Sequence, residues 1–164
     1  MGVYQSEFGF PTTRHESNYL QANLILAEMG VIEPMRLEGW IRATVSDVDE
    51  AFELVPNLEH LNLSISTSEQ MIEGKFRGKK DKRDIIAGMT QAVDRAKECG
   101  AASIGVNAED ASRTDMDYLL QFATAAKEHG AQRIRYCDTL GYDNPFTLYE
   151  SCKTLAEEVG IGIE

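Results

Sequence analysis

The first candidate site lies in residues 101–114, where charged side chains follow a short apolar run. Apolar residues alternate with small or polar ones over residues 102–106, which predicts a short buried strand. Two carboxylates, Glu109 and Asp110, come directly after it, and Arg113 follows before a predicted helix. In α/β folds the carboxyl end of a strand holds the backbone still while the next loop presents side chains for chemistry. Asp110 also has a structural interpretation, which we favour: it caps the next helix and pairs with Arg113.

A second polar group follows the next predicted strand, in residues 132–137. Asp138 and Thr139 come at its end, although a threonine there could equally bond the backbone of a turn. Arg135 lies between two residues that point the other way, so it could face the interior of the fold or form a structural ion pair. Cys137 has no neighbouring base, which favours a small buried residue over a nucleophile.

One segment of this acidic chain, residues 67–83, is basic. Six cations occur there: Lys75, Arg77, Lys79, Lys80, Lys82 and Arg83. They could clamp an anionic ligand such as a phosphate-bearing cofactor. We favour the simpler interpretation, a long solvated polar loop that leads into a helix beginning near Asp84.

The elements that must position these residues are indicated by a recurring helix end. Four helical patterns close on Glu-x-Gly and are followed by an apolar run, at Gly30, Gly100, Gly130 and Gly160. The last three are spaced by about 30 residues, the length of a βαβ step, and glycine adopts the left-handed helix cap easily. A parallel α/β sheet is therefore expected.

Five further elements are expected before the first candidate site. Strands are expected over residues 3–10, 35–44 and 60–66. Ser17 or Asn18 is expected to open the first helix, and Ser46 with Asp49 resembles a capping box for the second.

Composition narrows the class of protein. A length of 164 residues and a hydrophobic fraction of 43 % predict one ordinary globular domain. The net charge of −11 argues against nucleic acid or an anionic membrane as partner. Three scattered cysteines without a C-x-x-C, no secretory signal and no apolar stretch of membrane-spanning length together predict a cytoplasmic protein.

Two motifs at successive strand ends carry a resemblance to a known family. The run from Asn107 to Asp115 (NAEDASRTD) resembles an AED-x-x-R signature, and the run from Arg135 to Gly141 (RYCDTLG) resembles a DT-x-G signature. Residues 9–11 (GFP), 39–43 (GWIRA) and 61–68 (LNLSISTS) add further likeness. The chain thus resembles the acyl-CoA-condensing metallolyases: homocitrate synthase, 2-isopropylmalate synthase, Re-type citrate synthase and related lyases.

The resemblance implies a fold and a reaction. The fold would be a partial (β/α)8 TIM barrel, with residues 1–164 supplying the second through sixth strands and a stub of the seventh, as an internal fragment. The reaction would be homocitrate synthase-like: condensation of acetyl-CoA with a 2-oxo acid, followed by release of CoA. The first strand and the strands after the sixth would be missing, so the fragment alone would be inactive.

The resemblance also assigns roles to six residues. Glu109 would be catalytic, positioning or deprotonating the substrate, and Thr139 would bind the carboxylate of the 2-oxo acid. Substrate contacts are likewise expected from Asn62, Ser64, Asn107 and Arg135. A divalent metal is expected for the intact enzyme, but the family's metal ligands (an aspartate of the first strand and a His-x-His pair after the seventh) have no counterpart in this sequence. Asn107 and Gly105 differ from the residues often found there in lysine-pathway homocitrate synthases, so the 2-oxo acid stays open.

Several alternatives remain at the level of sequence. The intact protein could be a Re-citrate synthase or a 2-isopropylmalate synthase. The chain could also be a non-catalytic part-barrel that associates with a partner, and in either case we expect a homo-oligomer or a complementing chain. A small doubly wound domain of flavodoxin type shows the same alternation of strands and helices, but residues 9–13 make a poor phosphate loop.

Overall fold

The computed structural model describes residues 3–32 and 35–164, in which strands and helices alternate. The elements in chain order are β1 (Gln5–Gly9), α1 (Arg14–Glu28), β2 (Arg36–Arg42), α2 (Val45–Leu54), β3 (His60–Ser66), α3 (Glu69–Phe76), α4 (Lys82–Glu98), β4 (Ser103–Glu109), the 3₁₀ turn η1 (Ala111–Arg113), α5 (Met116–His129), β5 (Arg133–Tyr136), α6 (Pro145–Val159) and β6 (Gly162–Ile163).

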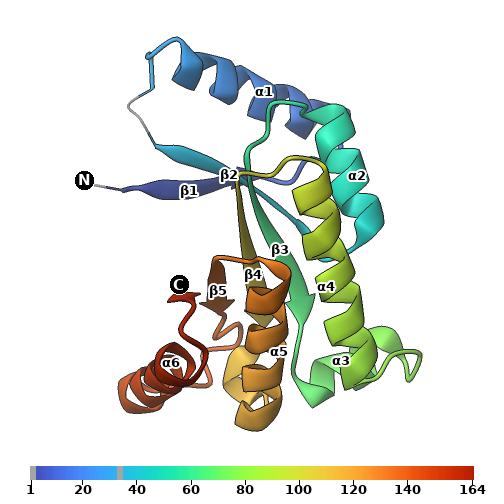
Figure 1. Cartoon of the computed structure of the whole chain (residues 1–164), viewed down its shortest axis with the longest axis vertical. Coiled ribbons are helices and arrows are strands. Elements are labelled where there is room, and N and C mark those ends of the chain that lie inside the picture. Colours follow the sequence, from blue (N-terminus) through green and yellow to red (C-terminus); the bar gives the residue numbers. More distant parts are fainter. Residues whose placement is uncertain (1–2, 33–34) are drawn as a thin grey trace.

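The strands form one parallel sheet in the order β1-β2-β3-β4-β5-β6. Each strand therefore pairs with the next one in the chain, and the order never reverses. A doubly wound domain requires such a reversal at its switch point. The structure thus excludes the flavodoxin-type alternative and confirms an open section of a (β/α)8 barrel (Figure 1).

The two faces of the sheet differ in chemistry because side chains alternate along each strand. The face that packs against the helices is apolar and includes Leu61, Leu63, Ile65, Ile104, Val106, Ala108 and Ile134. The opposite face, called the polar face below, carries Asn62, Ser64, Ser66, Ser103, Asn107, Glu109, Arg133 and Arg135. Strand register places Ser64, Asn107 and Arg135 in one row across β3, β4 and β5.

The polar face is concave. Arg135 on β5 is hydrogen-bonded to Glu7 on β1 at 2.5 Å, although three strands lie between them. In a flat sheet these strands would be about 19 Å apart, at about 4.8 Å per strand. The contact therefore requires the sheet to curl around the polar face, as a section of a barrel does.

The repeated glycines end helices as the sequence predicts. Positive φ angles are found at all four: Gly30 (70°), Gly100 (93°), Gly130 (110°) and Gly160 (64°). Each lies at or just after a helix end, in the left-handed region that glycine enters without a Cβ clash. The chain therefore turns back toward the sheet at regular intervals.

Two expected helix starts are wrong. Thr13, not Ser17 or Asn18, caps α1 by accepting a hydrogen bond from the Glu16 N–H. Thr44 caps α2 through the Asp47 N–H, so the expected pair of Ser46 and Asp49 is not the capping box. In both cases a threonine two to five residues upstream offers a hydroxyl oxygen for the cap, and the helix begins earlier than expected.

The long loop expected over residues 67–83 is also wrong, because α3 lies within it. Ser68 caps this helix by accepting from the Met71 N–H at 3.2 Å, and Arg77 ends it in the left-handed conformation at φ 51°. The helix buries only Ile72, so it has little of the apolar periodicity by which helices are recognised in a sequence.

Membrane-spanning helices are not found among residues 3–32 and 35–164: no helix there is both long and apolar enough.

Candidate active site on the polar face

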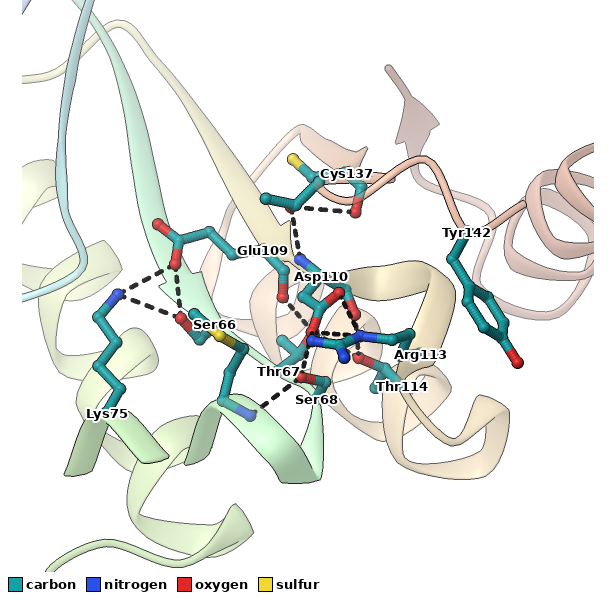
Figure 2. Close-up of polar contacts among 12 residues, drawn as sticks. Ser66, Thr67, Ser68, Lys75, Glu109, Asp110, Arg113, Thr114, Cys137 and Tyr142 are labelled. Carbon is teal, nitrogen blue, oxygen red and sulfur yellow. Dashed lines mark hydrogen bonds and ion pairs between the residues drawn. The ribbon is translucent and has the colours of Figure 1, made fainter. Parts of the chain in front are cut away.

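Glu109, at the end of β4, is the centre of a hydrogen-bond cluster. Ser64 donates to its Oε1 at 2.9 Å, and Ser66 donates to its Oε2 at 2.5 Å. Lys75, from α3, contacts the same Oε2 at 3.1 Å and the Ser66 Oγ at 3.1 Å. Figure 2 shows Lys75 and Ser66 converging on one carboxylate oxygen while the other oxygen points away from them.

These donors keep Glu109 ionised. Burial alone would raise the pKa of the Glu109 carboxyl, but hydrogen bonds from Ser66, Lys75 and Ser64, with the charge of Lys75, outweigh it and lower the pKa below its usual value. A carboxylate can accept about four hydrogen bonds, two at each oxygen. The three described here leave one position, at Oε1, for a substrate group.

Asp110 has one of the two structural roles expected of it. It does not cap the next helix, because Asp115 caps α5 through the Tyr118 N–H. The expected pairing with Arg113 is confirmed, by hydrogen bonds from Nε at 2.9 and 3.0 Å and from Nη2. Ser68 donates to the same carboxylate. The bonds from Arg113 lower the pKa of Asp110, and burial, which acts in the opposite sense, does not offset them.

Thr139 is joined to the site through the backbone. Its Oγ1 accepts a hydrogen bond from the Asp110 N–H at 2.9 Å, next in the chain to Glu109. Its hydroxyl proton is directed at the Cys137 carbonyl over 3.5 Å, a long contact that a substrate oxygen could replace. Burial raises the pKa of the Cys137 thiol to about 11, so this group is not a thiolate at neutral pH.

Two buried side-chain amides lie on the polar face, nearer the start of the strands than Glu109. Asn62 is fully buried and donates to Glu7 Oε1 at 2.9 Å, and Asn107 is 4 % exposed. The Oδ1 atoms of both have no hydrogen-bond partner within the described part of the chain. Buried polar atoms are normally paired, so these oxygens could accept hydrogen bonds from a bound molecule.

The sequence left open whether Arg135 faces the interior of the fold or forms an ion pair. In the structure it lies on the polar face and also forms ion pairs. Nη1 contacts Glu7 at 2.5 Å, and Nη2 contacts Glu164 at 3.0 Å. Its neighbour Arg133 pairs with the buried Glu38 and with Glu164. A guanidinium has five N–H donors, so Arg135 still has donors for a substrate carboxylate.

Two functional candidates, Ser66 and Ser68, were missed in the sequence, and Lys75 was named only as one of the six cations of residues 67–83. Ser66 had a readable signal, because it follows Asn62 and Ser64 at the strand period of two and must share their face. Ser68 and Lys75 depend on α3, whose weak apolar pattern concealed it.

A cleft of about 590 Å³ opens beside the Asp110–Arg113 pair, between the ends of β3 and β4 and the loop before α6. Its lining is mostly polar: Thr67, Glu69, Gln70, Lys82, Ser112, Arg113, Thr114, Asp115 and Tyr142. Arg113 thus lies between the buried Asp110 and this opening (Figure 2).

The metal that the family resemblance implies for the intact enzyme does not fit the residues present. Within residues 3–32 and 35–164, no three His, Cys, Asp or Glu side chains lie close enough together to hold a metal ion. Glu109 is instead occupied by Ser64, Ser66 and Lys75.

Comparison with known proteins identifies the family of the chain. The HMGL-like family model matches residues 1–164. Over all 164 residues the chain is 66 % identical to a citrate (Re)-synthase of Dehalococcoides mccartyi, and 41 % identical to a 2-isopropylmalate synthase of Caldanaerobacter subterraneus. A homocitrate synthase of Nostoc is 30 % identical over a 170-residue alignment that includes the whole chain. The chain spans about 40 % of the length of these relatives.

Solved structures show the same fold at low sequence identity. Deoxyribose phosphate aldolase from Aeropyrum pernix matches with a TM-score of 0.61 at 14 % identity, over 98 % of this chain and 74 % of that one. The carboxyl transferase domain of Rhizobium etli pyruvate carboxylase matches with a TM-score of 0.62 at 16 % identity, over 98 % of this chain and 26 % of that one. These similarities support the barrel architecture alone.

Proposed function

Because this chain belongs to the HMGL-like family, we propose that it is the central segment of a synthase that condenses acetyl-CoA with oxaloacetate to form citrate. The observation that carries the proposal is the 66 % identity to a citrate (Re)-synthase over the full chain. The 2-isopropylmalate and homocitrate synthases are less similar, at 41 % and 30 %. The sequence alone favoured a homocitrate synthase-like reaction, and the identities favour citrate among the options left open.

The polar face supplies groups suited to a substrate with two carboxylates. Arg135 offers N–H donors to one carboxylate, and the Thr139 hydroxyl offers a donor at the strand end. The Oδ1 atoms of Asn62 and Asn107 can accept a hydrogen bond from the hydroxyl group of the condensed product. Arg135 and Thr139 thus bind and orient the 2-oxo acid against the carboxyl ends of β4 and β5.

Glu109 acts in this proposal as an orienting acceptor more than as a general base. An efficient base has a pKa near the working pH, whereas the pKa of Glu109 is lowered. Its free position on Oε1 accepts a hydrogen bond from a substrate hydroxyl or enol, and the ionised carboxylate holds that group in one orientation. The proton of the acetyl group then has to be removed by a group other than Glu109.

A chimera tests the proposal. The chain replaces the matching segment of the Dehalococcoides mccartyi citrate (Re)-synthase, and the purified protein receives acetyl-CoA with oxaloacetate, 2-oxoglutarate or 2-oxoisovalerate. We expect citrate from oxaloacetate, at a rate well above the product formed from the other two acids. Preference for 2-oxoglutarate would favour the homocitrate reaction. A chimera that unfolds cooperatively and yet condenses none of the three would overturn the proposal and favour a non-catalytic part-barrel.

A further inference from the structure

Lys75 has a position that no feature of the proposed reaction yet explains. Its Nζ lies 3.1 Å from Glu109 Oε2 and 3.1 Å from Ser66 Oγ, across 34 residues of sequence in the first case. Resting on the function proposed above, we propose that Lys75 is a positioning residue for Glu109: it fixes which carboxylate oxygen is left for the substrate.

Helix α3 is built in a way that serves this purpose. At its first turn, the Ser68 hydroxyl caps the helix and also donates to Asp110. At its last turn, Lys75 donates to Glu109. The two ends of one short helix are thus attached to two consecutive residues at the end of β4, and Figure 2 shows both attachments.

Lys75 makes the two carboxylate oxygens of Glu109 unequal as hydrogen-bond acceptors. Oε2 of Glu109 receives both Ser66 and Lys75 and is therefore filled, whereas Oε1 receives only Ser64. Without Lys75, both oxygens would have one free position, and the carboxylate could rotate without losing a donor. The ammonium thereby turns a symmetric acceptor into a directed one.

The pair has little to contribute to stability, which separates positioning from a purely structural role. The side chain of Lys75 is 46 % exposed and that of Glu109 is 22 % exposed. Half-exposed ion pairs add little to the free energy of unfolding, because water screens the charges. A large effect on Glu109 with a small effect on folding is therefore the expected signature.

The titratable groups near Glu109 come from three places. Lys75 approaches from α3, Asp110 is next in the chain and is neutralised by Arg113, and the Cys137 thiol follows β5. Because Cys137 stays protonated at neutral pH and Asp110 is paired, Lys75 is the nearby charge that lowers the pKa of Glu109, beside the hydrogen bonds from Ser66 and Ser64.

The test uses the chain itself, with variants at Lys75 and a matched control. Lys75→Met removes the ammonium, Lys75→Arg retains a cation, and Lys79→Met removes an exposed lysine from the same basic segment. The carboxyl carbon of Glu109 is followed by carbon-detected NMR during a pH titration, and Glu109→Gln assigns its signal. Lys75→Met should move the midpoint to higher pH, while Lys75→Arg and Lys79→Met should stay close to wild type.

Activity of the chimera gives a second readout. Lys75→Met should lower kcat/KM about tenfold or more, because a misdirected acceptor misplaces the substrate, and Lys75→Arg should recover most of it. A Glu109 midpoint unchanged in a folded Lys75→Met chain would overturn the inference, whatever the chimera does. An inactive wild-type chimera with a shifted Glu109 midpoint in Lys75→Met would instead overturn only the proposed reaction. If Lys75→Met fails to fold, Lys75→Gln takes its place with the same criteria.

Discussion

The pair of Arg133 and Glu38 predicts the largest single effect on folding. Glu38 lies on β2 with its side chain 1 % exposed, and Arg133 lies on β5 with its side chain 15 % exposed. Arg133 Nη2 donates to Glu38 Oε1, and Arg133 Nε contacts Glu164 at 2.8 Å. The pair joins two strands that are not neighbours, so it fixes the curvature of the sheet as well as two charges.

Arg133→Met removes one partner and leaves the other buried. Breaking a buried ion pair from one side costs about 3–5 kcal/mol. We take the lower end, about 3 kcal/mol, because Arg135 Nη2 remains 3.8 Å from Glu38 Oε2. In a domain of this size each kcal/mol lowers the Tm by about 2–4 °C, so the Tm should fall by about 6–12 °C.

The loss of unfolding free energy in Arg133→Met should increase as the pH rises. Burial raises the pKa of Glu38 above its ordinary value of 4.5, and Arg133 opposes that rise. A raised folded-state pKa means that stability is greatest below 4.5 and is lost as the pH rises through the folded-state pKa. Without Arg133 the pKa of Glu38 rises further, so the deficit of Arg133→Met should be larger at pH 7.5 than at pH 5.

Urea denaturation followed by circular dichroism at both pH values measures this. The matched control is Glu38→Met with Arg133→Met, which removes both charges and should recover most of the loss. If Arg133→Met lies within about 1 kcal/mol of wild type at pH 7.5, or if the double variant is no better than the single one, the pair is not the buried link described here.

Three further predictions concern the strand ends. Asp110→Asn keeps a residue that tolerates the left-handed φ of 61°, but it removes the negative charge that Arg113 and Ser68 bind. The free energy of unfolding, measured in urea, should fall by about 2 kcal/mol. An unchanged free energy of unfolding would contradict the pairing. The pKa values of Glu109 and Asp110 are lowered from their ordinary values of 4.5 and 3.8, so each ionised carboxylate stabilises the fold above that pH, and the stabilisation should be lost as the pH falls through the folded-state pKa. Calorimetry from pH 6 to pH 3 should therefore show a falling Tm, and the Tm of Glu109→Gln should fall less steeply over the same range. Cys137, with a thiol pKa of about 11, should react with iodoacetamide at pH 7.5 more slowly than a cysteine peptide, as judged by mass spectrometry; an equal rate would show that its thiolate is available.

The order of elements was predictable because it depends on local signals. Each of the four glycines that stop helices does so in the structure, and the strand expected over residues 102–106 is found as β4, which continues three residues further, to Glu109. The sheet order followed from the family motifs, since alternation alone does not distinguish a barrel section from a doubly wound domain. In the structure each strand pairs with the next one in the chain, and this order identifies a barrel section and excludes a doubly wound domain.

The parts that could not be predicted depend on contacts between distant residues. Arg135 meets Glu7 across 128 positions, and no local pattern encodes that distance. The role of Lys75 required α3, a short helix that buries only one residue and so has little apolar periodicity. The capping threonines Thr13 and Thr44 were passed over because the apolar pattern of each helix begins later than its first turn.

The most direct measurement of the proposed reaction is citrate formation by the chimera that carries this chain. Carbon-labelled acetyl-CoA and oxaloacetate are supplied to the wild-type chimera and to its Glu109→Ala variant, and labelled citrate is measured by NMR. We expect labelled citrate from the wild-type chimera and about 100-fold less citrate from the Glu109→Ala variant. Both proteins should melt cooperatively. Equal citrate from the two would contradict the assignment of Glu109 to the site, and a folded wild-type chimera that makes no citrate would contradict the proposed function.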